Sequence, residues 1–442
     1  MKFHHLVDLP MPLSRAQRMP RLRRDLATAL LAALLTACGG SGGSEAAPTT
    51  SSAGSSTTSS GSGTTITPGT GNPALGIKVA GDAPGRLVDV NGTTVQLRGV
   101  NVSALESQPI FQQKSDWNGQ TGTATPNWTL IKSAWQTNAV RVPLNEASWL
   151  GYTCSIGSGS KSVNPNPNKD YQTTVANAVA GATAAGLYVI IDLHWTAPAT
   201  YCPEAQNAMA DSDNSATFWT QVATAFKGYP NVIFEPFNEP YVGSFSVLLN
   251  GGPQTSFNTG NGTLNVSWTS AGMQSLVDAI RNTGATNVIL TSGLDYAKDL
   301  SGWLANKPTD ALNQLGAVWH AYPAYGTTIG TAAYAKPDHW PGVGSDVTNI
   351  LAAGYPVVIT EFGDHDVATT GISTAPFASW LLPYADALGG GGVVGYMGWT
   401  WDVWGNPDDV LITDAAGDPT PLYGVYTKAH YLCRAAGTST CP

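Results

Sequence analysis

The chain has 442 residues and a formal net charge of −9, with 42% hydrophobic and only 12% charged residues. The charged fraction is about half of the ~25% that is usual for globular proteins. Nucleic-acid-binding proteins need basic patches, so an acidic chain argues against that class. The length suits one large domain with appendages, and the acidic charge suits a soluble protein whose ligand is neutral.

The first 38 residues are predicted to form a lipoprotein signal peptide. Five arginines between residues 15 and 24 precede an apolar run, Leu26–Ala37, that is too short to span a bilayer and is typical of a signal-peptide core. The run ends in Leu35-Thr36-Ala37-Cys38, which resembles a bacterial lipobox. That resemblance implies an exported protein with a lipid on Cys38, in the outer membrane or later released. An ordinary signal peptide with an incidental cysteine is the alternative, and Met11 or Met19 is a possible true start.

Residues 39–73 are mostly Gly, Ser, Thr, Ala and Pro, which predicts a flexible linker rather than a domain. Residues 74–442 are expected to form one domain. Four cysteines remain after Cys38, and an even number in an exported protein suggests two disulfides. We expect Cys154–Cys202, from loops after neighbouring strands, and Cys433–Cys441, near the end of the last helix.

Eight short apolar runs alternate with helix-like stretches in the predicted domain. This alternation predicts an α/β fold, a (β/α)8 TIM barrel, preceded by a small β-hairpin turned at Asn91-Gly92. No glycine-rich phosphate motif follows the first run, which counts against a dinucleotide-binding fold. The runs are Val95–Val100, Ala139–Leu144, Tyr188–His194, Asn231–Phe237, Asn287–Ser292, Gly316–Tyr322, Pro356–Phe362 and Val393–Trp399. Helices are expected at Asp170–Ala185, Ala216–Lys227, Trp268–Thr283, Ala375–Leu388 and Tyr423–Tyr431.

Catalytic residues of such barrels lie at the carboxyl ends of the strands. Polar and aromatic residues follow six of the eight predicted strands at this end and are expected to converge on one rim, as a sugar-binding site requires. They are Arg141, His194, Trp195, Asn238, Glu239, His320, Tyr322, Glu361, Trp399 and Trp401.

Glu239 and Glu361 end strands four and seven, and the whole chain contains seven Glu. Hydrolysis of a glycosidic bond needs two carboxyl groups, one protonated and one ionised, and their surroundings separate the two pKa values. The alternative is that each is part of a structural salt bridge at the rim. Glu235 lies on the same strand face as Glu239 but deeper, so we interpret it as structural, paired with Arg141 beside Asp192.

Six segments, in order along residues 80–430, resemble glycoside hydrolase family five, in clan A. The most specific is Asn238-Glu239-Pro240, which is similar to the Asn-Glu-Pro signature of that family. The others are Asn138–Pro143, Ile191–Trp195, His320–Tyr322, Ile359–Gly363 and Gly398–Trp401.

The resemblance implies a role for each matching residue. Glu239 would be the acid/base and Glu361 the nucleophile of a retaining, double-displacement hydrolase. Asn238 would bind the sugar 2-hydroxyl, and Trp399, with Trp401 as a second candidate, would be the platform beneath the sugar. Arg141 and Tyr322 would hold the nucleophile ionised, and His194 and His320 would line the cleavage point.

The segment Trp399–Asp402 is most similar to endo-β-1,4-glucanases, which implies a cellulose-type polysaccharide as partner, no cofactor or metal, no nucleic acid and a monomer. Endo-β-mannanases and other β-glucanases share the six segments and remain alternatives. So does a non-catalytic glycan-binding surface lipoprotein. A metal-dependent hydrolase would favour histidine pairs at short spacing, which the predicted domain lacks. Candidate stacking surfaces along the cleft are Trp117, Trp195, Trp340 and Trp404.

The lipobox predicts that Cys38→Ala releases the protein from the membrane fraction, because the variant has no thiol to acylate. Fractionation of the expressing cells, followed by mass spectrometry of the mature N-terminus, measures this. An unmodified Cys38 in the wild-type protein would contradict the prediction.

Overall fold

The computed structural model describes residues 69–157, 159, 161–322, 343–363, 377–404, 410–438 and 440–442. Cys38, the predicted signal peptide, nearly all of the predicted linker and Trp340 lie outside these residues. Within the described residues, no helix has the length and apolar character needed to cross a membrane.

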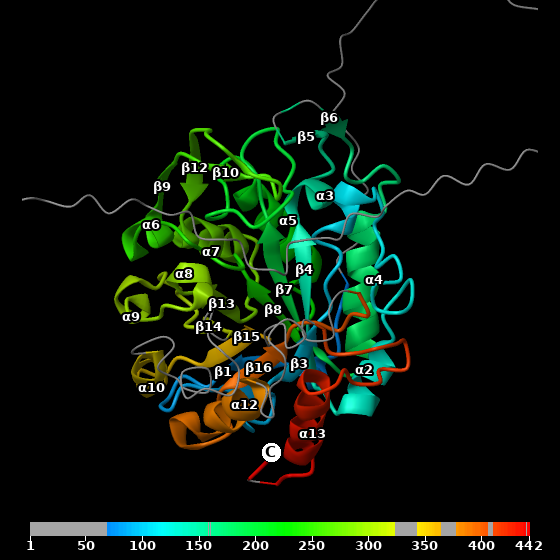
Figure 1. Ribbon diagram of the computed structural model, residues 1–442. Coiled ribbons are helices and arrows are strands. Elements are labelled where there is room, and N and C mark those ends of the chain that lie inside the picture. Colours follow the sequence, from blue (N-terminus) through cyan, green and yellow to red (C-terminus); the bar gives the residue numbers. More distant parts are fainter. Residues whose placement is uncertain are drawn as a thin grey trace, which may run out of the picture. The chain divides into compact units, whose positions relative to one another are not determined.

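A closed barrel of eight parallel strands forms the centre of the domain (Figure 1). Its strands follow one another around the ring in chain order, and β13 closes it by pairing with β8. All eight are buried or nearly so along their length, as expected for parallel strands covered by helices. They are β3 (Arg98–Asn101), β4 (Ala139–Asn145), β7 (Tyr188–Trp195), β8 (Val232–Glu235), β13 (Ile289–Ser292), β14 (Leu315–Ala321), β15 (Val357–Phe362) and β16 (Gly395–Gly398). The predicted TIM barrel is therefore confirmed, and each predicted strand overlaps an observed one.

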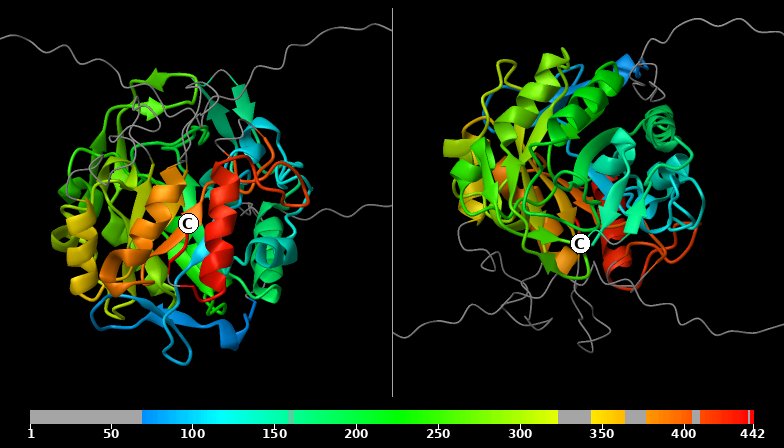
Figure 2. Two further views of the ribbon diagram at one scale, coloured as in Figure 1. Left: turned by 60° about the horizontal axis from the view of Figure 1, so that its bottom comes forward. Right: turned by 90° about the horizontal axis from the view of Figure 1, so that it is seen from above.

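Helices surround the barrel (Figure 2). Their apolar sides pack on the strands. The seven that follow a barrel strand and have eight or more residues are α2 (Trp128–Trp135), α4 (Tyr171–Ala184), α5 (Ser215–Phe226), α7 (Met273–Asn282), α10 (Val343–Ala352), α12 (Phe377–Ala387) and α13 (Tyr423–Ala435). Between β13 and β14 there are only two four-residue elements, α8 (Leu294–Ala297) and α9 (Trp303–Asn306).

The helix predicted at Trp268–Thr283 begins later than expected. Its first residues form β12 (Trp268–Ala271), an antiparallel partner of β9 (Gly251–Gln254), and the helix α7 starts at Met273. The intervening Gly272 has an extended backbone, with φ −83° and ψ 150°. Pairing with β9, together with the bond from the Trp268 indole to the Ser256 carbonyl, determines the structure of this segment more strongly than its helical pattern.

An N-terminal hairpin closes the amino-terminal end of the barrel (Figure 2). Its strands are β1 (Ile77–Val79) and β2 (Leu87–Asp89). The predicted turn at Asn91-Gly92 also forms, with Gly92 at φ +80°, but it adds only a single bridge between Val88 and Thr94. The apolar side chains of this hairpin pack on those at the lower ends of the strands. This cluster includes Ile77, Val79, Leu87, Leu97, Tyr188, Ile233, Val288 and Met397.

Loops and small sheets follow the strands at the opposite, carboxyl-terminal rim. The hairpin of β5 (Cys154–Ile156) and β6 (Lys161–Val163) follows β4, and a disulfide links Cys154 to Cys202 in the loop after β7. A second disulfide joins Cys433 to Cys441. Both predicted pairs are therefore present, and the first connects two neighbouring rim loops.

The two disulfides are expected to stabilise the fold unequally. Cys154–Cys202 spans 48 residues and Cys433–Cys441 spans 8. If each bond acts by restricting the unfolded chain, replacing the first pair by serine should lower the unfolding free energy by about 1.5 kcal/mol more than replacing the second. Urea unfolding of the two double variants measures the difference. Equal losses would contradict this account.

Candidate active site

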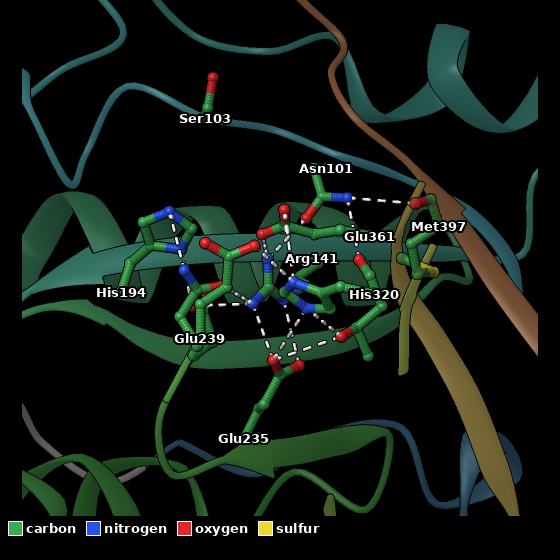
Figure 3. Close-up of polar contacts among 12 residues, drawn as sticks. Asn101, Ser103, Arg141, His194, Glu235, Glu239, His320, Glu361 and Met397 are labelled. Carbon is green, nitrogen blue, oxygen red and sulfur yellow. Dashed lines mark hydrogen bonds and ion pairs between the residues drawn. The ribbon is translucent and has the colours of Figure 1, made fainter. Parts of the chain in front are cut away.

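His194, Glu239, His320 and Glu361, all predicted at strand ends, gather around a central arginine, Arg141 (Figure 3). Arg141, on β4, is fully buried. Its guanidinium donates two hydrogen bonds to Glu235, at 2.7 and 3.1 Å. It also lies 2.6 Å from Glu361 Oε1 and 3.0 Å from Asp192 Oδ2. One cation thus contacts three carboxyl groups from three other strands, β7, β8 and β15.

Burial and this crowding determine the protonation of the deeper acids. Burial raises the pKa of Asp192 to about 7, although Arg141 acts to lower it. Burial likewise raises the pKa of Glu235 to about 8, against the same lowering effect of Arg141. Both pKa values therefore lie within the neutral range, because the cost of burying the charged carboxylates outweighs the lowering effect of Arg141. The interpretation of Glu235 as an interior partner of Arg141 is confirmed.

Glu361 lies at the upper end of β15, where two donors hold its carboxylate. Arg141 donates to Oε1 at 2.6 Å, and the Tyr322 hydroxyl donates to Oε2 at 2.9 Å. Burial raises the pKa of Tyr322 well above its usual value, so the phenol keeps its proton and remains a donor. A charged donor and a neutral donor both stabilise negative charge on Glu361.

Glu239 follows β8 and has a different environment. Its side chain is about one-fifth exposed (21%), and its Oε1 lies 3.0 Å from His320 Nδ1. Burial raises the pKa of Glu239 from an ordinary 4.5 to about 7. Burial also lowers the pKa of His320 to about 3, so this imidazole is neutral at neutral pH. The raised pKa of Glu239 suits a group that must donate a proton near neutral pH.

Thr360 lies between His320, which contacts Glu239, and Glu235, which contacts Arg141. Its hydroxyl lies 3.0 Å from His320 Nε2 and 3.3 Å from Glu235 Oε1. Thr360 and Glu361 are adjacent in β15, yet both contact residues inside the barrel. Strict alternation would turn one of them outward, but the pairing of β15 with β14 and with β16 is irregular here.

A family model described as cellulase (glycosyl hydrolase family 5) matches residues 88–404. The chain belongs to glycosyl hydrolase family 5. It is a glycoside hydrolase, and the family resemblance of its sequence is confirmed.

The relatives of this glycoside hydrolase include bacterial endoglucanases. It is 25% identical to endoglucanase A of Ruminococcus albus over 324 residues, which are 66% of this chain and 82% of the relative. It is 26% identical to endoglucanase N of Pectobacterium atrosepticum over 345 residues, which are 78% of this chain. This second match covers 61% of the length of the relative.

Solved structures share the fold. A β-glucanase from Saccharophagus degradans, crystallised with cellotetraose, superposes with a TM-score of 0.54 at 19% identity, over 84% of this chain and 98% of that one. The catalytic domain of an endoglucanase from Thermobifida fusca, also with cellotetraose, gives a TM-score of 0.51 at 17% identity, over 82% and 100%. At these identities the likeness supports the fold alone.

The enzyme also brings Asn238, His194 and Trp399 together. The Asn238 amide accepts from Arg141 at 2.8 Å, and its nitrogen lies 3.4 Å from His194 Nε2. The Trp399 ring stacks on His194, with centroids 5.5 Å apart and planes 12° apart. Burial lowers the pKa of His194 to about 4, so it is neutral at neutral pH. Trp399 keeps some exposure, as a platform needs.

Three other predicted aromatic residues, Trp401, Trp195 and Trp117, are buried. Trp401 is only 2% exposed and packs edge-on against Trp135, so its alternative assignment as the platform is wrong. Trp195 is 8% exposed and packs edge-on against Phe111. Trp117 is buried as well, whereas Trp404 is partly exposed.

The sequence analysis missed three residues that hold the site. Asn101, at the end of β3, accepts from Arg141 at 3.0 Å and donates to the Thr360 carbonyl at 3.0 Å. Ser292, at the end of β13, donates to the Phe237 carbonyl at 2.7 Å. These two end the first and fifth strands of the barrel, and their position at a strand end is the sequence signal that could have identified them. Gln206, which accepts from Asn238 at 2.9 Å, lies in a loop and gave no signal.

Glu239, His320 and Glu361 each offer a possible metal ligand, and these atoms lie within 4.8 Å of one another. Arg141 is in direct contact with Glu361, so its charge would repel a cation at this point. The Glu361 oxygens are also already bonded to Arg141 and Tyr322. The arrangement therefore suits proton transfer better than metal binding.

Replacing Arg141 by Met is expected to lower the unfolding free energy by about 3–5 kcal/mol at neutral pH, because buried carboxylates lose their cation. Asp192 and Glu235 already bind protons more tightly in the folded than in the unfolded protein, and loss of the cation increases this difference. The loss should therefore be largest above pH 7–8, the range of their pKa values in the intact network, and should shrink as pH falls.

Denaturation of the variant between pH 5 and pH 8.5 measures this dependence. The control is Arg86→Met, which removes the solvent-exposed pair with Asp82 at 2.6 Å. Exposed pairs contribute about 0–1 kcal/mol, so the control should lose little. A loss for Arg141→Met that does not change with pH would contradict the charge argument.

Proposed function

We propose that the enzyme is a retaining endo-β-1,4-glucanase in which Glu361 is the nucleophile and Glu239 is the acid/base. The observation that carries the proposal is the spacing of the two carboxyl groups, with an oxygen of each within 4.8 Å of the other. Retaining glycosidases have carboxyl groups ~5–5.5 Å apart, whereas inverting enzymes need ~6.5–9.5 Å to admit a water molecule.

In the first step Glu361 attacks the anomeric carbon, and Glu239 donates its proton to the departing oxygen. Arg141 and Tyr322 each donate a hydrogen bond to Glu361 and aim its carboxylate. The raised pKa of Glu239 keeps it protonated near neutral pH, as proton donation requires. Trp399 would lie beneath the sugar, and Asn238 would bind its 2-hydroxyl, as the family pattern implies.

In the second step water hydrolyses the glycosyl-enzyme. Glu239, now ionised, accepts a proton from the water, which attacks the same carbon from the side that the leaving group vacated. The negative charge on Glu361 is absent while it is esterified, so a repulsive charge near Glu239 is removed at the moment when Glu239 must be ionised. The proton returns to Glu239 when the cycle closes.

The proposed substrate class rests on the relatives and on the acidic charge of the chain. The two relatives described above are endoglucanases, and both structural neighbours were crystallised with cellotetraose. We therefore propose a cellulose-type β-1,4-glucan as substrate. Release of reducing sugar from a soluble cellulose derivative, mannan and β-1,3-glucan tests it, and preference for mannan would favour a mannanase instead.

We also propose that the enzyme acts outside the cytoplasm as a monomer, held to the outer membrane through a lipid on Cys38. This proposal rests on the lipobox and the low-complexity segment after it. The two disulfides support an oxidising compartment.

The proposed roles predict different behaviour for the two Glu variants. Glu361→Gln should lose nearly all turnover, because an amide cannot form the glycosyl-enzyme. Glu239→Ala should keep the first step for substrates whose leaving group is already a weak base, and azide should rescue the second step by attacking the intermediate. Stopped-flow and steady-state assays on an activated aryl cellobioside separate the steps.

NMR of the first anomer that wild-type enzyme releases provides the decisive measurement for this prediction. Retention of the β-configuration is expected from two successive displacements. Release of the inverted anomer would rule out Glu361 as nucleophile, whatever the activities of the variants.

The basic limb of the pH profile is predicted from Glu239. Because its pKa is raised to about 7, kcat/KM on an oligosaccharide should fall as pH rises through about 7, where the acid is lost. A dinitrophenyl leaving group needs no proton, so this limb should be weak with such a substrate. An oligosaccharide profile that already falls near pH 4.5, the ordinary value for Glu, would show that burial does not hold the proton.

A further inference from the structure

The loop after β7 places one side chain, Gln206, against the segment that carries the proposed acid/base. Gln206 is only 3% exposed, and both polar atoms of its amide have partners. Its oxygen accepts from the Asn238 amide at 2.9 Å. Its nitrogen donates to the carbonyls of Asn207 at 2.8 Å and of Glu239 at 3.0 Å. One side chain therefore contacts the side chain of Asn238 and the main chain of Glu239.

Arg141 fixes the direction of these amide hydrogen bonds. A guanidinium only donates, so the Asn238 amide, 2.8 Å from Arg141 Nη2, presents its oxygen to that group. The Asn238 nitrogen then faces Gln206, which must present its oxygen in turn. The Gln206 nitrogen is left for the carbonyls of Asn207 and Glu239, which only accept. Each amide between Arg141 and Glu239 thus has one orientation that satisfies its partners.

The Asn238 nitrogen carries a second hydrogen, which the protein binds weakly. Gln206 accepts one of the two hydrogens, and His194 Nε2 lies 3.4 Å from the nitrogen. That separation is longer than the ~2.7–3.2 Å of ordinary N–H hydrogen bonds in proteins. The second N–H of Asn238 is therefore available to a hydroxyl group of a bound sugar.

The loop holds Gln206 through its main chain. The Gln206 carbonyl accepts from the Asn258 side-chain amide at 3.1 Å and from the Tyr241 hydroxyl at 3.3 Å. The next residue, Asn207, accepts from the Asn258 main-chain N–H at 2.7 Å. Cys202, earlier in the same loop, joins it to the neighbouring rim loop through a disulfide. The position of Gln206 is therefore set by contacts that are separate from those of its side chain.

The bond to Gln206 supplies something that Arg141 alone does not. Arg141 determines which end of the Asn238 amide faces the barrel interior, but one contact leaves the amide plane free to tilt, because the last torsion of Asn has broad minima. A second contact at the nitrogen defines the plane. The direction of the second N–H is then defined as well.

We propose that Gln206 is a positioning residue that fixes the amide plane of Asn238 and so aims its free N–H at the 2-hydroxyl of the sugar. The inference rests on the proposed function, in which Asn238 binds that hydroxyl. Hydrogen bonds to the 2-hydroxyl strengthen in the transition state of glycoside hydrolysis, so a fixed donor accelerates the reaction rather than only tightening substrate binding. Gln206 acts on the sugar only through Asn238.

Three variants and one control test the proposal. Gln206→Met keeps the length of the side chain and removes its hydrogen bonds. Gln206→Asn replaces it if the methionine variant folds poorly, because this amide is one methylene too short to join Asn238 to the Glu239 carbonyl. Gln206→Glu keeps an oxygen toward Asn238. The control, Asn258→Leu, removes a bond to the Gln206 carbonyl and leaves the Gln206 side chain unchanged.

The first readout compares kcat/KM for two dinitrophenyl β-cellobiosides, one intact and one without the 2-hydroxyl of the transferred sugar. This leaving group needs no proton, so the position of Glu239 does not affect the result. Gln206→Met, or Gln206→Asn in its place, should lower kcat/KM by roughly 10–100-fold on the intact substrate, the effect of one misplaced hydrogen bond, and by less than about 3-fold on the deoxy substrate. Gln206→Glu should restore most of the loss, and Asn258→Leu should change both values by the same factor.

The second readout needs no turnover. Hydrogen exchange of the Asn238 side-chain amide can be followed by NMR in protein labelled with heavy nitrogen at Asn, with Asn238→Ala to assign the signal. Exchange should be at least about tenfold faster in Gln206→Met than in the wild type, because the N–H has lost its acceptor. Asn258→Leu should match the wild type.

Equal losses on the two cellobiosides in Gln206→Met, or an unchanged exchange rate, would overturn the inference, because Gln206 would then be structural only. A change of the intact-to-deoxy ratio in Asn258→Leu as large as that in Gln206→Met would overturn it as well. The proposed function fails separately if the wild type cleaves neither substrate, or both equally well. The exchange measurement still decides in that case whether Gln206 fixes Asn238.

Discussion

The site depends on one buried cation. Arg141 is fully enclosed, and a charge in such a place is tolerable only when it is paired and hydrogen-bonded. Its partners Asp192, Glu235 and Glu361 come from three different strands of the ring. They meet only when the barrel has closed, so folding of the barrel and assembly of the site are the same event. Glu361 is thus fixed at the rim by a network whose other members lie below it.

The hydrogen bonds that run from Glu239 through His320 and Thr360 to Glu235 can all donate in the same direction. A neutral His320 has one N–H, and Thr360 has one hydroxyl proton. If protonated Glu239 donates to Nδ1, then Nε2–H donates to Thr360, whose hydroxyl is left to donate to Glu235. Every donor then has one acceptor. Loss of the proton from Glu239 reverses its bond to His320, so the protonation of the rim carboxyl and that of the interior network are coupled.

The barrel and the position of its two rim carboxyl groups were predictable from the sequence. Each barrel strand is an apolar run, and each predicted carboxyl group lies at the end of one. Period-two spacing also placed Glu235 correctly below Glu239. The same rule misleads at Thr360, because the irregular pairing of β15 brings two adjacent residues inside. Trp401 resembles a second platform in sequence, but the chain after Trp399 turns it toward Trp135. A left-handed turn at Asp295–Ala297 contains no glycine and gives no local signal; only its contacts with Pro240 and Asp299 explain it.

The two ends of the barrel differ in a way that bears on the chemistry. The hairpin β1–β2 closes the lower end with apolar side chains such as Ile77 and Leu87, which pack on the apolar interior beneath the arginine network. Little water can reach the carboxyl groups from below, and their low-dielectric surroundings raise the pKa values of Glu235 and Glu239. The hairpin lies at the end of the barrel opposite Glu239 and Glu361. Its apolar side chains nevertheless add to the burial that raises the pKa of Glu239. Stability at the lower end and acid–base function at the upper end are therefore linked through solvent exclusion rather than through direct contact.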